Sequence, residues 1–431
     1  MNNTIKLAVA SALLATASSA SAAGGIVAGD WTLDIGGIVN AYYTSTKHSG
    51  DNSGAFTAGG NANGQQNQSN ITTGLLPNYL VVSGKTRQND LDVGFTISIQ
   101  PGASNTSSLD YTGSTQENRQ AFITFGDASW GSIKIGKDIG IFAQDAILND
   151  MTLLGVGSAA GTLRGNTTTL GRIGSGFIYA DFKPQIAYTS PNFNGLQFTA
   201  GVTQAWDSTG DIGLGGGTSA GTGSTPAFEG KVQYAFAGDV SGKVWVSALS
   251  QKIRNAGAVA TVASSTVWTP VGSSTNTSTF IPAVAGVAGH SETARAFDIG
   301  GTVSMAGFGL TGYYYDAKGL GHQYQFRGGL DASGNKRDSD GFYVQGTYTL
   351  PGVGTKLGVS YGESNLNMNT VDAAGDLTTK MWTVGAYHPL TKHLNLVAEY
   401  SDAQDKQDAH GLTAETKSKA KTVSLGAILF F

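Results

Sequence analysis

The sequence contains no cysteine, and only 9 of its 431 residues are proline. Without cysteine, a disulfide framework and a thiolate metal site are both excluded. Charged residues make up 13 % of the chain, well below the ordinary share of about 25 %. The 26 basic and 30 acidic residues leave a net charge of −4, so the basic stripe of a nucleic-acid-binding protein is missing. Beyond residue 23 there is also no apolar run of about 18 residues, the length that a transmembrane helix needs.

Glycine and aromatic residues are abundant instead. Glycine occupies 62 of 431 positions, roughly twice its usual share of about 7 %. The chain also has 6 tryptophans, 16 tyrosines and 18 phenylalanines. Plentiful aromatic residues and a small net charge argue against a disordered chain. The composition therefore indicates a large β protein that carries little charge.

The first 22 residues have the pattern of a secretory signal peptide. An apolar run over residues 7–17 is followed by the small residues Ala20 and Ala22, which fit the pocket of a signal peptidase. The run is too short to cross about 30 Å of hydrocarbon. We therefore predict that the chain is exported and cleaved after Ala22, and that residues 23–431 form one β-barrel domain.

Strict alternation of apolar and polar residues is the main structural signal. Over residues 91–100 every odd position is apolar and every even position is small or polar, which is the period of a β-strand with two different faces. The same pattern predicts sixteen strands, near residues 31–45, 78–87, 90–100, 117–126, 130–137, 182–190, 195–206, 226–237, 240–252, 292–305, 307–316, 340–350, 354–364, 377–388, 392–402 and 420–431.

The connections between these strands alternate between short and long. Tight turns such as Gln88–Asn89 and Ala306–Gly307 are followed by long polar loops. Short turns on one rim and long loops on the other are typical of up-and-down transmembrane barrels. We therefore predict an all-β fold, a sixteen-stranded antiparallel transmembrane β-barrel, and disfavour a soluble β-sandwich or β-helix. The long loops are expected at 46–77, 101–116, 138–181, 207–225, 253–291, 317–339, 365–376 and 403–419.

The end of the chain has a pattern of its own. The terminal Phe431 is preceded by apolar residues at alternate positions, namely Val423, Leu425, Ala427 and Leu429. A free apolar edge strand would invite aggregation, so we predict that the last strand pairs with the first. The pattern resembles the C-terminal signal by which the assembly machinery recognises bacterial outer-membrane barrels.

Four stretches of the sequence resemble the Gram-negative general porins, most closely those of β-proteobacteria. They are residues 31–43, residues 131–137, residues 188–195, which match Tyr-x-Ser-Pro-x-Phe-x-Gly, and residues 387–393. The resemblance implies a homotrimer of barrels in the outer membrane, each with a third external loop, 138–181, that folds inward and narrows a water-filled pore. It also implies contact with the lipid bilayer, with lipopolysaccharide and with the assembly machinery.

By the same resemblance, carboxylates of the third loop face basic residues across the pore. The acidic candidates are Asp138, Asp145 and Asp150. The chain departs from the family pattern where Leu154–Gly155 replaces an acidic segment, so the resemblance does not fix the ion preference. The loop is also unusually apolar for a solvent-exposed segment, which favours packing against the barrel wall.

Strand parity and nearness to this loop select the basic candidates for the pore wall. Such groups across a narrow aqueous pore would create a transverse field that orients dipolar solutes. Two alternatives stay open: basic side chains that reach the rim or lipopolysaccharide phosphates, and helix capping by Asp145 or Asp150. The basic candidates are Lys85, Arg87, Arg119, Lys134, Lys137, Arg164 and Arg172.

The sequence offers no sign of catalysis. None of the 6 histidines pairs with a nucleophile at a recognisable spacing, and no metal site stands out. We therefore predict a channel without a cofactor or a nucleic-acid partner, through which ions and small hydrophilic solutes diffuse passively. A substrate-selective channel of the same architecture is the main alternative. A surface adhesin or receptor that uses loops 46–77 and 253–291 is a weaker one.

Overall fold

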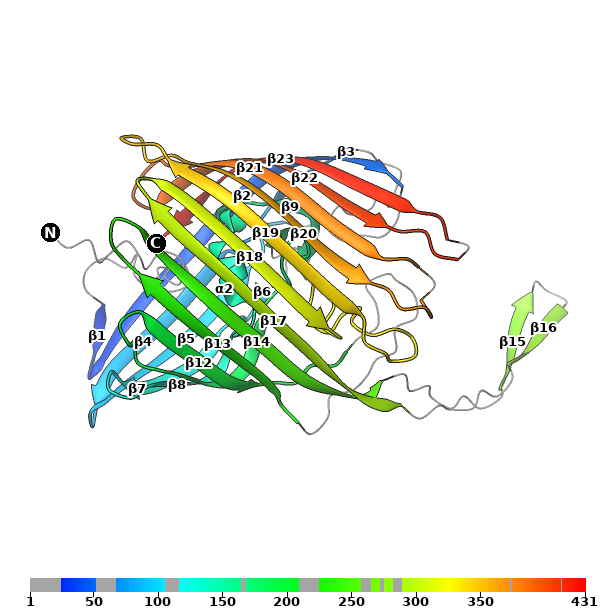
Figure 1. Cartoon of the computed structure of the whole chain (residues 1–431), viewed down its shortest axis with the longest axis horizontal. Helices are drawn as coiled ribbons and strands as arrows, with labels where there is room; N and C mark the ends of the chain where they lie inside the picture. Colours follow the sequence, from blue (N-terminus) through cyan, green and yellow to red (C-terminus); the bar gives the residue numbers. More distant parts are fainter. Residues whose placement is uncertain are drawn as a thin grey trace.

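The protein is described by a computed structural model that covers residues 25–51, 67–104, 116–163, 168–208, 225–256, 265–271, 275–281, 289–372, 374–411 and 413–431. The predicted signal peptide, 1–22, lies outside the described residues. Sixteen strands of the described part form one barrel (Figure 1). In chain order they are β2 (Trp31–Gly50), β4 (Tyr79–Gln88), β5 (Leu91–Pro101), β7 (Ala121–Asp127), β8 (Gly131–Ile139), β11 (Phe182–Thr189), β12 (Leu196–Thr203), β13 (Ala227–Phe236), β14 (Ser241–Ala256), β17 (His290–Met305), β18 (Phe308–Lys318), β19 (Asp338–Thr349), β20 (Lys356–Asn367), β21 (Leu377–Pro389), β22 (Leu394–Gln407) and β23 (Thr416–Phe430).

The barrel closes between the first and the last of these strands. β2 pairs with β4 on one side and with β23 on the other, both antiparallel. The backbones of Gly37 and Phe431 exchange two hydrogen bonds, with N···O distances of 2.8 and 3.0 Å. The predicted sixteen-stranded antiparallel barrel is confirmed, and its closure leaves neither terminal strand with a free edge.

Several short elements extend the barrel strands or lie in the loops. β1 (Ile26–Ala28) and β3 (Asn67–Thr72) pair with β2, and β6 (Gln116–Glu117) pairs with β5. β9 (Ser158–Leu163) and β10 (Thr168–Gly171) form a separate pair, as do β15 (Ser265–Val271) and β16 (Thr275–Ile281). The third loop also holds helix α2 (Gln144–Asn149) and the 3₁₀-helix η2 (Met151–Leu154). These elements lie outside the sixteen strands that the alternation predicts, and α2 agrees with the one or two helical turns that the sequence allows over residues 143–148.

The barrel strands bury their polar side and expose their apolar side. On β2, Ile35, Val39 and Tyr43 are 49 %, 54 % and 50 % exposed, whereas Asn40 and Thr44 are 2 % and 3 % exposed. A soluble sandwich would show the reverse. A strand that faces lipid on one side and the lumen on the other needs apolar side chains on the first face and polar side chains on the second.

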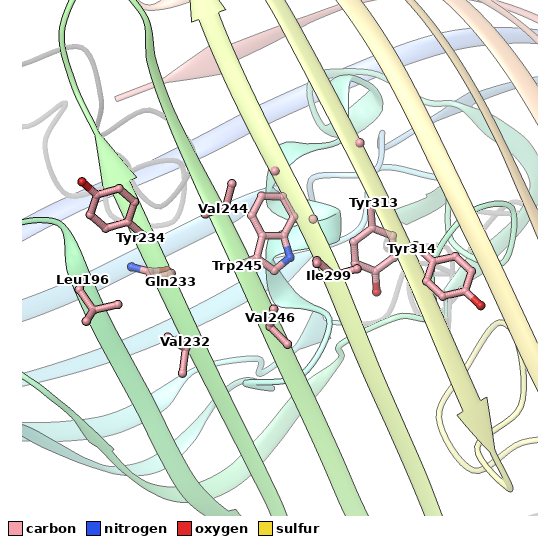
Figure 2. Close-up of a pocket in the computed structure, with 13 residues that line it drawn as sticks. Leu196, Val232, Gln233, Tyr234, Val244, Trp245, Val246, Ile299, Tyr313 and Tyr314 are labelled. Atoms are coloured by element: carbon pink, nitrogen blue, oxygen red, sulfur yellow. The ribbon is translucent and has the colours of Figure 1, made fainter.

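A shallow apolar groove crosses the outer face of β13, β14, β17 and β18 (Figure 2). It is lined by Val244, Val246 and Tyr314 together with the paired glycines Gly301 and Gly312. A Cβ atom added at Gly312 would meet nothing within 4 Å, so the hollow exists because side chains are missing there. The apolar lining suits lipid hydrocarbon better than a polar solute.

Three loop segments lie inside the barrel. They are the first-loop segment (73–78), the described parts of the third loop (140–163 and 168–181) and the sixth-loop segment (319–337). Buried apolar side chains from all three join one cluster with inward-facing strand residues, and Figure 1 shows α2 within the outline of the barrel. The lumen is therefore narrowed by three parts of the chain.

Candidate functional site

The third loop begins by binding a carboxylate of the barrel wall. The backbone N–H groups of Ile141 and Phe142 donate to Oε2 of Glu229 on β13, with N···O distances of 2.8 and 2.9 Å. Lys183 on β11 donates to Oε1 of the same carboxylate at 2.6 Å. The side chains of Glu229 and Lys183 are both 0 % exposed, and buried charges persist only when they are paired and hydrogen-bonded. Glu229 therefore fixes the start of the loop and neutralises a buried lysine.

Inward-facing side chains of β17 and β19 hold helix α2 against the wall. Asp298 accepts a hydrogen bond from the backbone N–H that precedes the helix, at 3.2 Å. The hydroxyl of Tyr343 donates to the carbonyl of Ala146 at 2.8 Å, and the amide of Gln345 donates to the carbonyl of Asn149 at 2.6 Å. The last carbonyls of a helix have no partner within it, so these strand side chains satisfy them and fix the position of α2.

A second carboxylate binds the loop beyond η2. Oε2 of Glu399 on β22 accepts the N–H groups of Val156 and Gly157 at 2.7 and 2.9 Å, and Tyr387 donates to Oε1 at 2.6 Å. A Cβ atom added at Gly155 would lie 2.2 Å from Oε1 of Glu399. A side chain at this position would therefore push the Glu399 carboxylate away from the N–H groups that it accepts.

The other two inward segments contact the third loop directly. In the first-loop segment, the N–H of Leu75 donates to the carbonyl of Gly155 at 2.8 Å. In the sixth-loop segment, the carbonyl of Gln323 accepts the N–H of Tyr179 at 2.9 Å, and the side-chain amide of Gln325 donates to the carbonyl of Tyr179 at 3.2 Å. The three segments therefore form one hydrogen-bonded unit inside the barrel.

A cavity of about 40 Å³ remains between the third loop and the wall formed by β2 and β4. We call it the Arg119 cavity, after the charged residue in its lining. Its volume holds a few water molecules, and most of its lining is apolar. The lining includes Leu75, Leu76, Arg119, Ile147, Leu148 and Leu153.

Asp145 lies in the first turn of α2, next to two lysines of the barrel wall. Asp145 is 3 % exposed; it pairs with Lys231 on β13 at 2.8 Å and also with Lys243 on β14. Burial alone would raise the pKa of Asp145, but the two ammonium groups outweigh burial and hold the pKa below its ordinary value of 3.8. Asp145 therefore acts in this structure as a link between α2 and the wall.

Asp150 and Asp138 are also buried and partnered. Asp150 is the N-cap of η2 and accepts from the N–H of Thr152 at 3.0 Å, which matches the capping alternative. Burial raises the pKa of Asp150, although Arg172, 3.9 Å away, opposes the shift. Asp138 pairs with Lys134 and accepts from Gln120 at 2.7 Å.

The predicted basic residues next to the third loop separate into two groups. Arg119 lines the cavity, and Lys134 lies on the inward face of β8 with Asp138. Lys137 shares the parity of Ile135, which is 38 % exposed on the outer face, and donates to the carbonyl of Asn118 at 2.9 Å. Residues two apart on a strand point to the same face, so Lys137 points outward like Ile135 and away from the lumen. Lys134, three positions earlier, points inward.

The remaining basic candidates do not gather around the cavity. Arg172 is 0 % exposed and donates to the carbonyl of Met381 at 2.9 Å and to Ser360, so it joins the loop to β21 and β20. Arg87 pairs with Asp92 and Asp127 beside the short turns, and Lys85 is exposed on the same strand. Arg164 lies outside the described residues.

Sequence reasoning missed most of the residues that hold the loop. The set comprises Glu229, Lys231, Lys243, Asp298 and Glu399. The sequence feature that could have identified them is a charged residue at an inward-facing strand position. Asp298 is an example, because it lies between the outward-facing Phe297 and Ile299, which are 46 % and 52 % exposed. The alternation reveals that such a charge faces the lumen, but it does not reveal which loop atom the charge binds.

The predicted C-terminal signal lies on the outer face of β23. Val423, Leu425, Leu429 and Phe431 are 45 %, 54 %, 38 % and 43 % exposed, and Ala427 shares their parity. Recognition of these residues by an assembly machinery remains a prediction. None of the described helices is long and apolar enough to cross a bilayer, and no group of three or more potential metal ligands occurs in the described parts of the chain.

Known protein families identify the barrel. The family described as Gram-negative porin matches residues 8–408. This chain is a Gram-negative porin. It forms an outer-membrane channel for passive diffusion and is not an enzyme. The β2–β23 barrel with its inward third loop is the structural basis of that channel.

Solved structures share the fold of this porin at low sequence identity. The outer membrane channel DcaP of Acinetobacter baumannii is 15 % identical over 95 % of this chain and 100 % of that one, with a TM-score of 0.63. An anion-selective porin from Comamonas acidovorans is 16 % identical over 93 % of this chain and 100 % of that one, with a TM-score of 0.55. OmpT of Vibrio cholerae in a trimer form is 15 % identical over 93 % and 99 %, with a TM-score of 0.52. No curated protein sequence gives a significant match.

Proposed function

We propose that this porin works as a homotrimer of the β-proteobacterial type, in which ions and small hydrophilic solutes diffuse through each barrel. The four motif stretches of the sequence support the subtype. The similar fold of OmpT, an outer membrane protein of Vibrio cholerae solved in a trimer form, supports the assembly. The Comamonas acidovorans porin of similar fold is anion-selective.

One observation carries this proposal: inward polar side chains both line the wall and hold the loop that narrows the lumen. Glu229, Asp298 and Glu399 bind backbone N–H groups of the third loop from three different strands. A loop fixed at several points leaves a passage of constant width. Constant width is what a channel needs when it sorts solutes by size.

Planar-bilayer recording tests the proposal. The mature protein is added to one side of a lipid bilayer with a salt gradient across it, and single insertions are recorded. Three equal conductance steps per insertion and a linear current–voltage relation are expected for an open trimer. Single steps would contradict the homotrimer, and a bilayer that stays silent would contradict the open pore. The sign of the reversal potential then gives the ion preference.

A substrate-selective channel is the second candidate function, and the lining of the Arg119 cavity favours it. Leucine and isoleucine from the first-loop segment and the third loop line this cavity, and an apolar surface beside the third loop suits a solute with an apolar part better than a strongly hydrated one. The adhesin alternative depends on loops 46–77 and 253–291, which lie partly outside the described residues.

A further inference from the structure

Three lysines occupy alternate positions at the long-loop end of β23, namely Lys417, Lys419 and Lys421. They share the parity of the exposed Val423, and the two residues between them are each 2 % exposed, so the lysines lie on the outer face of the barrel. Lys47 on the neighbouring β2 is exposed and lies directly opposite Lys421. We call Lys47, Lys417, Lys419 and Lys421 the lysine patch, which spans the strands where the barrel closes (Figure 1).

The patch begins where the apolar band of the wall ends. The outward positions of β23 are apolar from the terminal Phe431 up to Lys421, and a strand tilted by about 40° rises roughly 26 Å over this distance. The apolar band of an outer-membrane barrel is about 25 Å tall. In the same row of the sheet, Trp382 pairs with Asp402 and Asp402 with Lys421, and the ring of Trp382 lies 5.2 Å from that of Tyr400. Such aromatic rings mark the boundary between hydrocarbon and head groups, so the patch lies at the level of the head groups.

Carboxylates offset only part of the charge of the patch. Among the residues that the structure describes, its one ion pair joins Lys421 and Asp402 at 3.9 Å. Oδ2 of Asp51 accepts the backbone N–H of Lys417 at 3.0 Å, and residues 52–66, which follow Asp51, include no acidic residue. Four lysines therefore share two carboxylates, and the patch carries a net positive charge.

The register of the strands places like charges next to each other. Lys47 and Lys421 are directly opposite on the outer face, a pairing that costs free energy unless an anion lies between them. Lys417 is likewise opposite Lys406, whose charge two loop carboxylates offset. A phosphate group suits such a surface, because an ammonium group is a compact charge that binds phosphate. The apolar stems of the lysines can lie along the wall while the ammonium groups reach the head groups.

We propose that the lysine patch binds the phosphate groups of lipopolysaccharide, the glycolipid of the outer leaflet. The long loops of an outer-membrane barrel lie on the cell surface, so the patch meets the outer leaflet and not the phospholipids of the inner one. The acyl chains of the bound lipid lie along Val423 and Leu425, which continue the same face of β23. The site concerns the membrane around the porin, so the inference does not depend on which solutes pass through the lumen.

Binding of lipid A, the phosphorylated anchor of lipopolysaccharide, tests the inference. The full mature chain is refolded in a neutral detergent without lipid and titrated with three probes: lipid A, the same lipid without its phosphates, and phosphatidylglycerol. Native mass spectrometry counts the bound molecules. We expect lipid A to bind at least about 10-fold more tightly than the dephosphorylated form, and we expect a higher ionic strength to weaken its binding.

Two double variants separate the charge of the patch from its other properties. Lys419→Gln with Lys421→Gln is expected to weaken lipid A binding about 10-fold or more. Lys419→Arg with Lys421→Arg keeps both charges and should retain the binding. The control is Lys318→Gln with Lys392→Gln, which removes the same number of charges elsewhere. Lys318 already pairs with a carboxylate, and Lys392 lies in the short turn between β21 and β22 at the opposite rim, so lipid A binding should not change. Migration of the unheated protein on a gel shows that each variant is folded.

Equal binding of lipid A and its dephosphorylated form to the natural protein would overturn the inference. Unchanged lipid A binding in the folded Lys419→Gln and Lys421→Gln variant would also overturn it. Phosphatidylglycerol that binds as tightly as lipid A would contradict the assignment to lipopolysaccharide. A trimer that forms without lipid in the natural protein, but not in this variant, would assign the patch to a contact between subunits instead.

Discussion

Carboxylates inside this barrel bind the backbone of an inward-folded loop. Glu229, Asp298 and Glu399 accept loop N–H groups, and Asp145 links α2 to two wall lysines. A carboxylate used in this way contributes to the shape of the pore and also cancels a nearby positive charge. Removing one such group therefore has two consequences, a weaker loop and an exposed cation, which different measurements can separate.

Asp145→Asn should shift the reversal potential toward anions. The substitution removes the counter-charge of Lys231 and Lys243, whose side chains are 11 % and 12 % exposed, and leaves two cations on the lumen wall. The reversal potential in a salt gradient measures the shift. A matched control is Asp338→Asn, because its partner Lys318 is 59 % exposed and screened by salt. Equal shifts in the two variants would contradict this role of Asp145.

The same ion pairs predict how conductance responds to acid. Because the pKa of Asp145 is lowered in the folded protein from its ordinary value of 3.8, its stabilising contribution is fully present above that value and is lost as the pH falls further through the folded pKa. The ion pairs of Asp145 should therefore hold α2, and with it the single-channel conductance, unchanged from neutral pH to about 4. Below that pH the conductance of a single channel should begin to fluctuate. Asp145→Asn should abolish that change, and persistence of the change in the variant would assign it to another group.

Glu229→Gln should destabilise the folded barrel strongly. Lys183 would stay buried without a counter-charge, and removing one partner of a buried ion pair typically costs about 3–5 kcal/mol. Urea unfolding in lipid vesicles measures the loss. Glu415→Gln is the control, since Glu415 is 53 % exposed and a surface pair contributes only about 0–1 kcal/mol. Similar losses for the two variants would contradict the anchoring role of Glu229.

At the scale of elements, the strands follow from local pattern and the loop structure does not. The alternation of residues 91–100 is enough to place β5, because each position needs only an inward or an outward direction. The alternation does not place every strand end. β2 continues to Gly50 and β14 to Ala256, beyond the predicted 45 and 252, because pairing with a neighbour extends a strand past its apolar pattern. The contacts of α2 depend on residues from distant strands, so no local pattern encodes them.

Leu425→Arg in β23 should destabilise the barrel by about 2–4 kcal/mol if this position lies near the middle of the membrane. Leu425 is 54 % exposed on the outer face, where a charge would meet hydrocarbon. The neighbouring Ser424 faces inward and is 1 % exposed, so Ser424→Ala serves as the control. Folding yield into lipid vesicles and urea unfolding provide the measurement. A Leu425→Arg protein as stable as the control would place this face away from lipid.

At the scale of the whole molecule, three loop segments share the lumen, although only the third was predicted to fold inward. The sixth-loop segment reads as a polar glycine-rich loop in the sequence, yet Leu320 and Phe326 within it are 0 % exposed. Two isolated apolar residues do not distinguish an inward loop from an exposed one. Likewise, predicted pore-lining charges such as Lys137 and Arg172 have other positions, because strand parity and loop packing decide where a charge lies.

The central claim is that this porin conducts through a lumen that loop packing narrows. The most direct test compares the single-channel conductance of the natural protein with that of a variant in which residues 320–336 are replaced by a short glycine–serine turn. We predict that both conduct, and that the shortened variant conducts more, because the contacts of Tyr179 with Gln323 and Gln325 are lost. A silent natural protein, or equal conductance of two folded proteins, would contradict the account.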